Sequence, residues 1–377
     1  MLEIKRGVLK QQLFSRPGIE GYAVEVNGRE EKCIVYTDLV GKVKSGDPVL
    51  LNTTAESLHL GSGGYHYVIA GLNGEEKPLP AGGHIMKLRY TPLQVKVLSA
   101  EEEDSPYHQE LKDADSLEGI PVLAATLHSM LAPLALQLHR AGFKAAYLMT
   151  DGAALPLQFS QTVDWLARNG IIAGTVTVGH AFGGDVEAVN IYSGLLAARA
   201  AFHPDVIIVS MGPGIVGTGT RWGFSGVEQG MVLNAVETLQ GVPIAVPRIS
   251  FADARPRHQG ISHHTLTVLS RVCKVRCLLP LPELPAEQMS RILQQVHQAG
   301  LFDRHEVYVE PAQEALERFR SSEMKLTTMG RTVEQDREFY MALAAAARLV
   351  EKLLLGQELH RITADGLSGG TSIQPAP

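Results

Sequence analysis

The stretch Val206-Ile-Ile-Val-Ser-Met-Gly-Pro-Gly-Ile-Val-Gly217 joins a continuously apolar segment directly to a glycine-rich loop. A short apolar run rich in β-branched residues is typical of a strand that is buried on both faces, as in parallel sheets. The glycines fit the spacing G-x-G-x-x-G, in which positions without side chains let backbone N–H groups approach a phosphate. This stretch predicts an α/β fold with a ligand loop at the end of a strand.

The same alternation of strands and helices continues on both sides of this stretch. From Gly119 onward the sequence predicts strands over 121–126, 144–149, 171–178, 205–211, 242–247, 275–279 and 306–309. It predicts helices ending near 141 and over 157–169, 186–202, 226–240, 264–271 and 286–299, and a last helix from the capping box Thr332/Gln335 to about Leu355. We expect residues 119–360 to form a three-layer α/β/α domain with a mostly parallel, Rossmann-like sheet.

The N-terminal block has a different pattern. Between Glu20 and Leu98 short strands follow tight turns, and Asn27-Gly28 is a typical hairpin turn. We expect residues 1–98 to form a small antiparallel β-barrel. An acidic segment, 99–118, is interpreted as a solvated linker, with a partner-docking strip as the alternative. The composition of 361–377 predicts a flexible tail.

Composition limits the classes of partner. The chain has 34 basic and 40 acidic residues and a net charge of −6, which argues against a nucleic-acid surface but leaves room for a local phosphate site. We find no signal peptide, no membrane-spanning run and too few cysteines for a disulfide framework, so we expect a cytoplasmic protein. The Ala344–Ala347 run predicts close packing on the sheet or on a second subunit, and therefore a possible homo-oligomer.

Polar residues follow several predicted strands at their carboxyl ends, where open parallel sheets bind ligands. The candidates for binding an anion are the glycine loop, with Thr218 and Thr220, and the fork donors Arg248 and Arg257. The loop has a second interpretation, as a tight structural turn. Standard NAD binding is disfavoured, because no helix clearly begins inside the motif and no acidic residue ends the next strand.

Histidines and aspartates supply the candidates for catalysis. We expect one of His180, His258, His263 and His264 to transfer protons, and Asp151 or Asp253 to orient it or to bind a metal. Because His263 and His264 are adjacent, we expect them to point in different directions, so that at most one serves a given centre. Ser262 or His263 is also a candidate helix cap.

A metal site is the alternative for some of the same positions. The candidate ligands are His128, Asp151, His180, Asp185 and His263. Two of them have simpler interpretations, Asp151 in an ordinary turn and Asp185 as the N-cap of a helix. Cys273 and Cys277 are one residue too far apart for a C-x-x-C redox pair, and we interpret them as semi-buried thiols.

Several strings together resemble a bacterial family known as domain of unknown function 3866. They are Gly46-Asp-Pro-Val-Leu-Leu-Asn-Thr-Thr-Ala55, Leu60-Gly-Ser-Gly-Gly-Tyr-His66, His84-Ile-Met-Lys-Leu-Arg-Tyr-Thr-Pro92, the loop Gly212 to Thr220, Arg257-His258, Ser262-His-His264 and Met329-Gly-Arg331. The resemblance spans nearly the whole chain. It implies no established activity and gives no catalytic residues, but it supports treating the two blocks as one unit.

Three functions are compatible with these residues. The first is an enzyme that acts on a small anionic, phosphate-bearing molecule by histidine acid–base chemistry. The second is a metal-dependent hydrolase with a His/Asp cluster. The third is a sensor or scaffold without catalysis, in which the glycine loop binds an effector.

Overall fold

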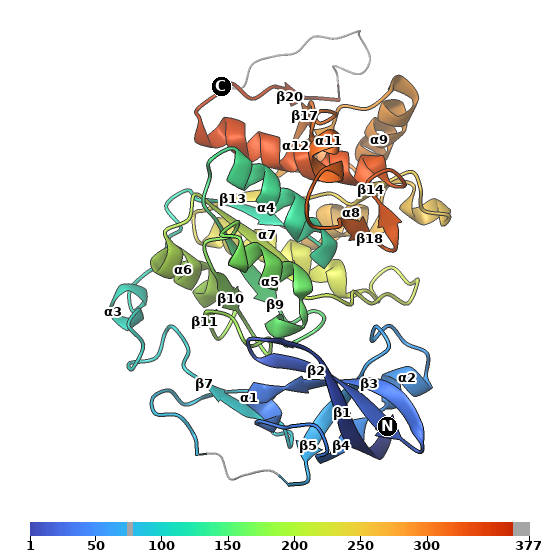
Figure 1. The fold of residues 1–377 in the computed structure, drawn as a ribbon. Coiled ribbons are helices and arrows are strands. Elements are labelled where there is room, and N and C mark those ends of the chain that lie inside the picture. The colour runs from blue at the N-terminus through green and yellow to red at the C-terminus, as the bar shows by residue number, and fades with distance from the viewer. Residues whose placement is uncertain (74–77, 365–377) are drawn as a thin grey trace. The chain divides into compact units, whose positions relative to one another are not determined.

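The computed structural model describes residues 1–73 and 78–364 and divides the chain into two compact units, Met1–Leu98 and Ser99–Pro377 (Figure 1). The predicted tail therefore lies mostly outside the described residues. Each unit has its own apolar core, built around Leu9, Val24 and Leu51 in the first and around the large sheet in the second.

The first unit is a closed five-stranded barrel in the order β1-β2-β3-β5-β4. Its strands are β1 (Ile4–Arg16), β2 (Ile19–Val26), β3 (Arg29–Tyr36), β4 (Pro48–Asn52) and β5 (His66–Gly71), with the short helices α1 (Thr37–Val40) and α2 (Thr54–Ser57) and a separate ladder of β6 (Ile85–Lys87) and β7 (Val95–Val97). The expected barrel is present, but β3 and β5 pair in parallel. The strand order explains this pairing. Strand β4 pairs with β1 on one side and with β5 on the other, so β5 closes the barrel against β3.

The second unit contains a nine-stranded, mostly parallel sheet in the order β11-β10-β9-β12-β8-β13-β16-β17-β20. Its strands are β8 (Pro121–Ala124), β9 (Ala145–Thr150), β10 (Thr175–Thr177), β11 (Val186–Glu187), β12 (Val206–Met211), β13 (Val242–Ala245), β16 (Leu278–Pro282), β17 (Glu306–Glu310) and β20 (Arg361–Ile362). β20 is antiparallel to β17, and the other neighbours are parallel. The carboxyl ends of the parallel strands therefore lie at one edge, as predicted.

Helices and short ladders connect these strands. The helices are α3 (His108–Leu111), α4 (Leu131–Arg140), α5 (Gln161–Arg168), α6 (Ile191–Phe202), α7 (Glu228–Thr238), α8 (His263–Thr267), α9 (Ala286–Gln298), α10 (Leu301–Arg304), α11 (Ala315–Arg320) and α12 (Arg337–Leu354). Single turns are η1 (His128–Met130), η2 (Leu157–Phe159), η3 (Ser225–Val227), η4 (Pro256–His258) and the π-helical η5 (Val268–Val272). Two ladders pair β14 (Ile249–Ser250) with β15 (Gly260–Ile261) and β18 (Thr327–Thr328) with β19 (Arg331–Thr332).

Two predicted helix starts are wrong. The helix expected from Val186 begins at Ile191 after the N-cap Asn190, because Val186 and Glu187 pair with β10 as strand β11. The last helix begins at Arg337. Gln335 accepts a hydrogen bond from the Thr332 backbone N–H at 3.0 Å, as in a capping box, but this closes a turn before the helix.

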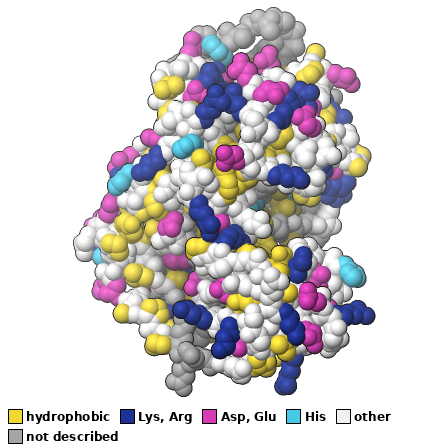
Figure 2. All heavy atoms as spheres, in the orientation of Figure 1, with side chains coloured by type: hydrophobic (Ala, Val, Ile, Leu, Met, Phe, Trp, Pro, Cys, Tyr) yellow, Lys and Arg dark blue, Asp and Glu magenta, His cyan; other side chains and the backbone are white. Residues whose placement is uncertain are grey.

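Helix α12 packs against the sheet through its small side chains. Ala344, Ala345, Ala346 and Ala347 are buried, and the helix contacts β16, β17 and α4. Figure 1 shows α12 as the long orange-red helix beside α4. Among the described residues, no helix combines the length and the apolarity that crossing a membrane requires. On the face shown in Figure 2, acidic and basic side chains are interspersed.

The acidic segment 99–118 is packed on the second unit. The Ala100 N–H donates to the Glu187 carbonyl at 2.8 Å, and Glu101 accepts a hydrogen bond from the Val189 N–H at 2.9 Å. Glu102 accepts the Ser99 N–H at 2.7 Å. This part of the segment is therefore an ordered extension of the sheet edge and not a solvated linker.

Candidate functional site

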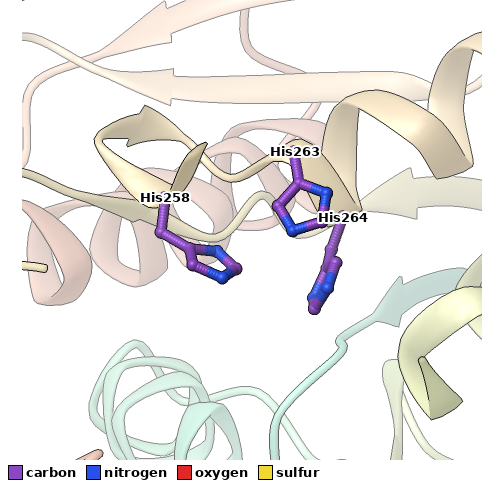
Figure 3. A group of neighbouring side chains, drawn as sticks. All are labelled: His258, His263 and His264. Carbon is purple, nitrogen blue, oxygen red and sulfur yellow. The ribbon is translucent and has the colours of Figure 1, made fainter. Parts of the chain in front are cut away.

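Three histidines converge after strand β13. His258 ends the turn η4, and His263 and His264 are the first two residues of helix α8. One ring nitrogen from each lies within 4.8 Å of the others (Figure 3). We call these three residues the histidine group. The expectation that the adjacent His263 and His264 point in different directions is wrong, because their ring centroids are only 4.2 Å apart.

A two-stranded ladder explains why these residues meet. Ile249 of β14 pairs with Ile261 of β15, so the loop between them returns to its starting point. The Ser262 N–H donates to the Arg248 carbonyl at 2.9 Å, which places the start of helix α8 beside the start of the loop. His258 lies just before the returning strand and His263 just after it, and the ladder brings both to one place.

Neighbouring side chains hold two of the three rings. The Ser262 hydroxyl lies 2.8 Å from His258 Nδ1 and also caps helix α8 by accepting the His264 N–H at 3.3 Å. Ser262 is therefore the predicted helix cap. The His264 ring stacks on Phe224, with centroids 3.9 Å apart and planes 2° from parallel. His263 Nε2, by contrast, is buried and has no hydrogen-bond partner among the residues that the structure describes.

The surroundings of the histidine group favour uncharged imidazole. Burial, together with nearby arginines, lowers the pKa of His258 to about 4. Burial and the neighbouring histidines lower the pKa of His264 to about 3, and burial and Arg257 lower the pKa of His263. At neutral pH the three rings are therefore neutral and have free lone pairs.

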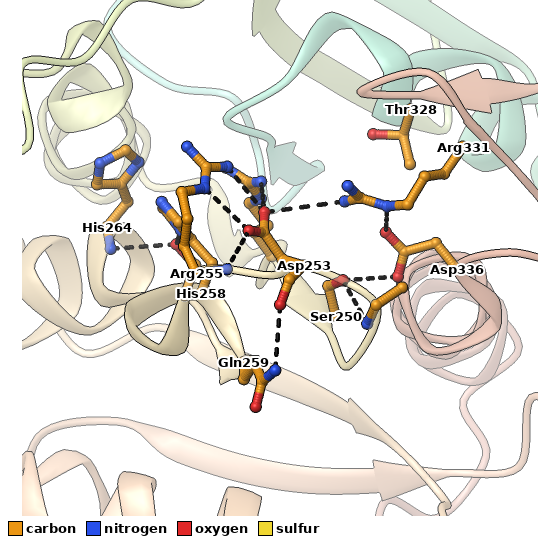
Figure 4. A network of polar contacts seen from close by, with 12 residues as sticks. Ser250, Asp253, Arg255, His258, Gln259, His264, Thr328, Arg331 and Asp336 are labelled. Atoms are coloured by element: carbon orange, nitrogen blue, oxygen red, sulfur yellow. Dashed lines mark hydrogen bonds and ion pairs between the residues drawn. The ribbon is translucent and has the colours of Figure 1, made fainter.

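Beside the histidine group, three arginines surround one carboxylate (Figure 4). Asp253 accepts hydrogen bonds from Arg248 at 3.2 Å and from Arg255 at 2.8 and 2.9 Å, and Arg331 lies 3.9 Å away. The hydrogen bonds from Arg255 hold the pKa of Asp253 well below its usual range. Arg331 also pairs with the buried Asp336 at 2.8 Å. The side chain of Asp253 therefore binds arginines. Among the described residues it makes no hydrogen bond with a histidine, so it is not placed to orient one.

Arg257 differs from the other three arginines in that its guanidinium is unpaired among the described residues. It is exposed, and it makes no hydrogen bond or ion pair with any other residue that the structure describes. Its guanidinium nitrogens lie 3.8 Å from the position that a Cβ on Gly219 would occupy. A small cavity of about 180 Å³ opens here, lined by Ile215, Val216, Gly217, Gly219, Arg248, Arg255, Arg257, His258, His264 and Met329.

The glycine loop folds back on itself as a small hairpin. Gly217 forms a bridge with Phe224, and the Thr218 N–H donates to the Gly223 carbonyl at 2.7 Å. The hydroxyls of Thr218 and Thr220 lie 2.9 Å apart and bond within the hairpin. Only part of the loop, from Ile215 to Gly219, reaches the cavity, and the next helical turn begins as late as Ser225.

Two glycines of this loop are needed for structural reasons. A Cβ on Gly212 would lie 2.5 Å from the Ala154 carbonyl oxygen, and Gly214 has a φ of +106°, which L-residues rarely adopt. The structural-turn interpretation therefore describes Gly212 and Gly214, whereas Gly217 faces the cavity, with His264 3.7 Å from its Cβ position.

The other predicted metal ligands lie elsewhere. His128 bonds to the Ser160 hydroxyl at 2.6 Å and lies 3.3 Å from Tyr147, and burial lowers its pKa to about 4. Asp185 accepts hydrogen bonds from both the N–H and the hydroxyl of Thr175, at 2.9 and 2.8 Å, and so secures the start of β10.

Asp151 and His180 are neighbours at the ends of β9 and β10. Asp151 accepts the His180 backbone N–H at 2.9 Å, and it lies where a side chain on Gly179 would be. Of the five predicted metal ligands, only His263 belongs to a group of three candidate ligands among the residues described.

The sequence did not point to several residues that lie at or near the carboxyl edge of the sheet. Phe224 stacks on His264. Arg331 comes from the β18–β19 ladder and Asp336 from the position just before α12, both about 70 residues further along the chain than the histidine group. Glu228, at the start of α7, accepts a hydrogen bond from Thr150 at 2.6 Å, and burial raises its pKa to about 7. The string Met329-Gly-Arg331, which contributes to the family resemblance, was the one signal in the sequence for this region, and Met329 lines the cavity.

Together these features define an α/β protein with an N-terminal closed barrel and a histidine group at the carboxyl edge of a parallel sheet. The model of a family described as protein of unknown function, DUF3866, matches residues 32–347. The chain belongs to this family. Comparison with curated proteins and with solved structures gives no match.

Proposed function

We propose that this protein is a metal-dependent enzyme that hydrolyses a small anionic, phosphate-bearing molecule, with His258, His263 and His264 as the metal ligands. One observation carries the proposal: His263 Nε2 is buried without a hydrogen-bond partner, beside two other neutral imidazoles. A buried polar atom without a partner costs about 1–3 kcal/mol, and a metal ion at this point would remove that cost.

The geometry of the histidine group suits zinc. Three histidine ligands with an open fourth position are typical of catalytic zinc, with Zn–N distances of about 2.0–2.1 Å. The ring nitrogens, which lie within 4.8 Å of one another, need only small side-chain movements to reach such an ion. Ser262, bonded to His258 Nδ1, would fix the orientation of that ring and leave Nε2 for the metal.

The metal would supply the nucleophile. A bound water has its pKa lowered to about 7 by zinc, so hydroxide is available at neutral pH. This chemistry agrees better with the lowered histidine pKa values than proton donation by a histidine does, because little imidazolium exists at pH 7.

Charge and size define the substrate. Arg257 has no partner among the described residues, and Arg248, Arg255 and Arg331 share the carboxylates Asp253 and Asp336. The excess of positive charge favours an anion, and a cavity of about 180 Å³ suits a phosphate group with a small substituent. The bound anion would also offset the repulsion between the arginines and a metal dication.

The fold supports the same location. We treat the large sheet as the middle of a three-layer, Rossmann-like domain, since helices connect its successive parallel strands. We place the reaction in the cytoplasm, which suits the free cysteines Cys33, Cys273 and Cys277.

The test has a binding arm and a turnover arm. The chelated, purified chain is titrated with Zn²⁺ by calorimetry and then assayed against a panel of phosphomonoesters, phosphodiesters and phosphoanhydrides. We expect zinc-dependent release of phosphate or phosphomonoester. We expect His263→Gln to abolish it, while the control His297→Gln, an exposed histidine on α9, leaves it unchanged.

Two results would count against this function. A zinc stoichiometry that is the same in His263→Gln and His264→Gln as in the parent would exclude a metal site at the histidine group. Anion binding that needs Arg257 but gives no turnover with any tested metal would favour the sensor.

A further inference from the structure

A second group of metal-binding side chains lies apart from the histidine group. It consists of Cys273, Cys277 and His305, and we call it the thiol group. Its two sulfur atoms and one ring nitrogen lie within 4.8 Å of one another. Each of the three residues is only 1% exposed. The proposed hydrolysis makes no use of them.

Strand register brings two of these residues together. Cys277 directly precedes β16 and His305 directly precedes β17, and these parallel strands pair with Leu278 opposite Glu306. The Glu306 N–H donates to the Cys277 carbonyl at 3.0 Å. Cys277 and His305 are therefore neighbours at the amino ends of two adjacent strands, whereas the histidine group follows the carboxyl end of β13.

Cys273 comes from the helical segment that also carries the histidine group. Helix α8 begins with His263 and continues as the π-helical turn η5, and Cys273 follows the last residue of that turn. The Cys273 N–H still donates to the Val268 carbonyl at 2.9 Å. The thiol group thus connects the end of this segment to β16 and β17.

Hydrogen bonding selects the tautomer of His305 that a metal requires. His305 Nε2 donates to the Leu269 carbonyl at 2.9 Å, because a carbonyl can only accept. Nδ1 therefore carries the lone pair; it accepts the Cys277 N–H at 3.4 Å and lies 3.3 Å from the Cys277 sulfur. A ring N–H that donates to a backbone carbonyl is the usual arrangement around a metal-bound histidine.

We propose that Cys273, Cys277 and His305 bind a thiophilic d¹⁰ cation, zinc in the first place, in a site that stabilises the fold. Thiolate and imidazole are the ligands that such ions prefer, and three of them leave one tetrahedral position for a water molecule. Binding releases the two thiol protons to solvent and changes no oxidation state. Two thiolates neutralise the dication, so the site can stay buried without net charge.

The site is independent of the proposed hydrolysis. Backbone groups of Leu269, Val275 and Cys277 make its hydrogen bonds, and it lies in the apolar core with Leu269 and Leu279. Burial in the apolar core suits an ion that stabilises the fold, and the open cavity beside the histidine group suits a catalytic one.

Cobalt distinguishes the two sites, because only thiolate ligands give an intense sulfur-to-cobalt charge-transfer band in the near ultraviolet. The full chain, purified under reducing conditions and treated with a chelator, is titrated with Co²⁺. We expect this band to saturate at one equivalent per thiol group and to disappear on adding Zn²⁺. We expect Zn²⁺ alone to raise the melting temperature of the chelated protein by a few degrees.

Matched variants assign the band. Cys277→Ser and Cys273→Ser should lose it, and Cys33→Ser, which removes the buried cysteine of the barrel, should keep it. His263→Gln should also keep it, so failure of the histidine site and failure of the thiol site are separate results. A wild-type chain that gives no band, whether its thiols titrate as free or are joined as a disulfide, would overturn the proposal. So would a band that persists in both Cys273→Ser and Cys277→Ser.

Discussion

The histidine group and the thiol group have similar dimensions but opposite surroundings. In each, three candidate ligand atoms lie within 4.8 Å. The first borders a cavity lined by arginines and contains a ring nitrogen without a partner. The second is almost fully buried, and backbone groups satisfy it. The two groups therefore differ in solvent access and in nearby charge, and our proposals of a reactive and a structural site rest on that difference.

Replacing a histidine should have the largest effect. We expect His264→Gln to lower zinc affinity and hydrolysis by at least about 100-fold, because changes outside the first ligand shell already cost 10–100-fold. Calorimetry and a hydrolysis assay measure both quantities. The thiol group should still give its cobalt band in this variant, and loss of both sites together would mean that the variant has unfolded.

Arg257 tests the charge that distinguishes the histidine group. Arg257→Ala should lower kcat/KM for an anionic substrate by about 10- to 100-fold, since a hydrogen bond to a charged group contributes about 1.5–3 kcal/mol. Zinc binding without substrate should not weaken, because removal of a nearby cation reduces repulsion. The control is Arg221→Ala, an exposed arginine that does not line the cavity. If Arg257→Ala and Arg221→Ala lowered kcat/KM equally, Arg257 would have no specific role in binding the substrate.

Ser262 tests how the rings are held. Ser262→Ala removes a helix cap and the contact with His258, so we expect a stability loss of about 1 kcal/mol and a 10- to 100-fold loss of metal affinity. Ser160→Ala is a matched control, because Ser160 caps α5 and contacts His128. It should lose similar stability and keep metal affinity, as followed by urea unfolding and zinc titration. If both variants bind zinc like the parent, Ser262 does not position His258.

Glu228 belongs to neither group, so we expect its replacement to change stability and to leave metal affinity and hydrolysis least affected. Burial raises its pKa from 4.5 to about 7, so the folded state holds a proton that the unfolded state has released between these values. Stability should fall as pH rises through this window, by up to about 3 kcal/mol. Glu228→Gln should flatten the fall and stabilise the protein above pH 7. Unfolding by urea from pH 4 to 8 checks this, and an unchanged pH profile would contradict it.

Local patterns were sufficient for much of the fold. The apolar runs before Thr126 and through Met211 predict buried parallel strands, and Asn27-Gly28 predicts the β2–β3 hairpin of the barrel; the structure confirms these elements. Strand β1 was missed because its exposed polar residues, such as Lys10 and Gln11, hide the alternation. Its pairing with β2 and β4 depends on the closure of the barrel, which no local pattern reports.

The sequence suggested the loops in which the candidate site lies, but not which side chains meet there. Loops at strand ends suggested His258, His263 and His264 among other candidates, and the structure brings one ring nitrogen of each within 4.8 Å of the others. Their convergence depends on the β14–β15 ladder, whose strands have two residues each and leave no periodic signal. Cys277 and His305 meet through strand register across 28 positions, and Arg331 reaches Asp253 from a distant ladder. Such contacts arise from tertiary structure.

The most direct test is anomalous diffraction at the zinc absorption edge from crystals of the zinc-loaded protein. The account predicts a peak bonded to one nitrogen each of His258, His263 and His264, at about 2.0–2.1 Å. A fully loaded crystal with no peak at these three rings would contradict the central claim.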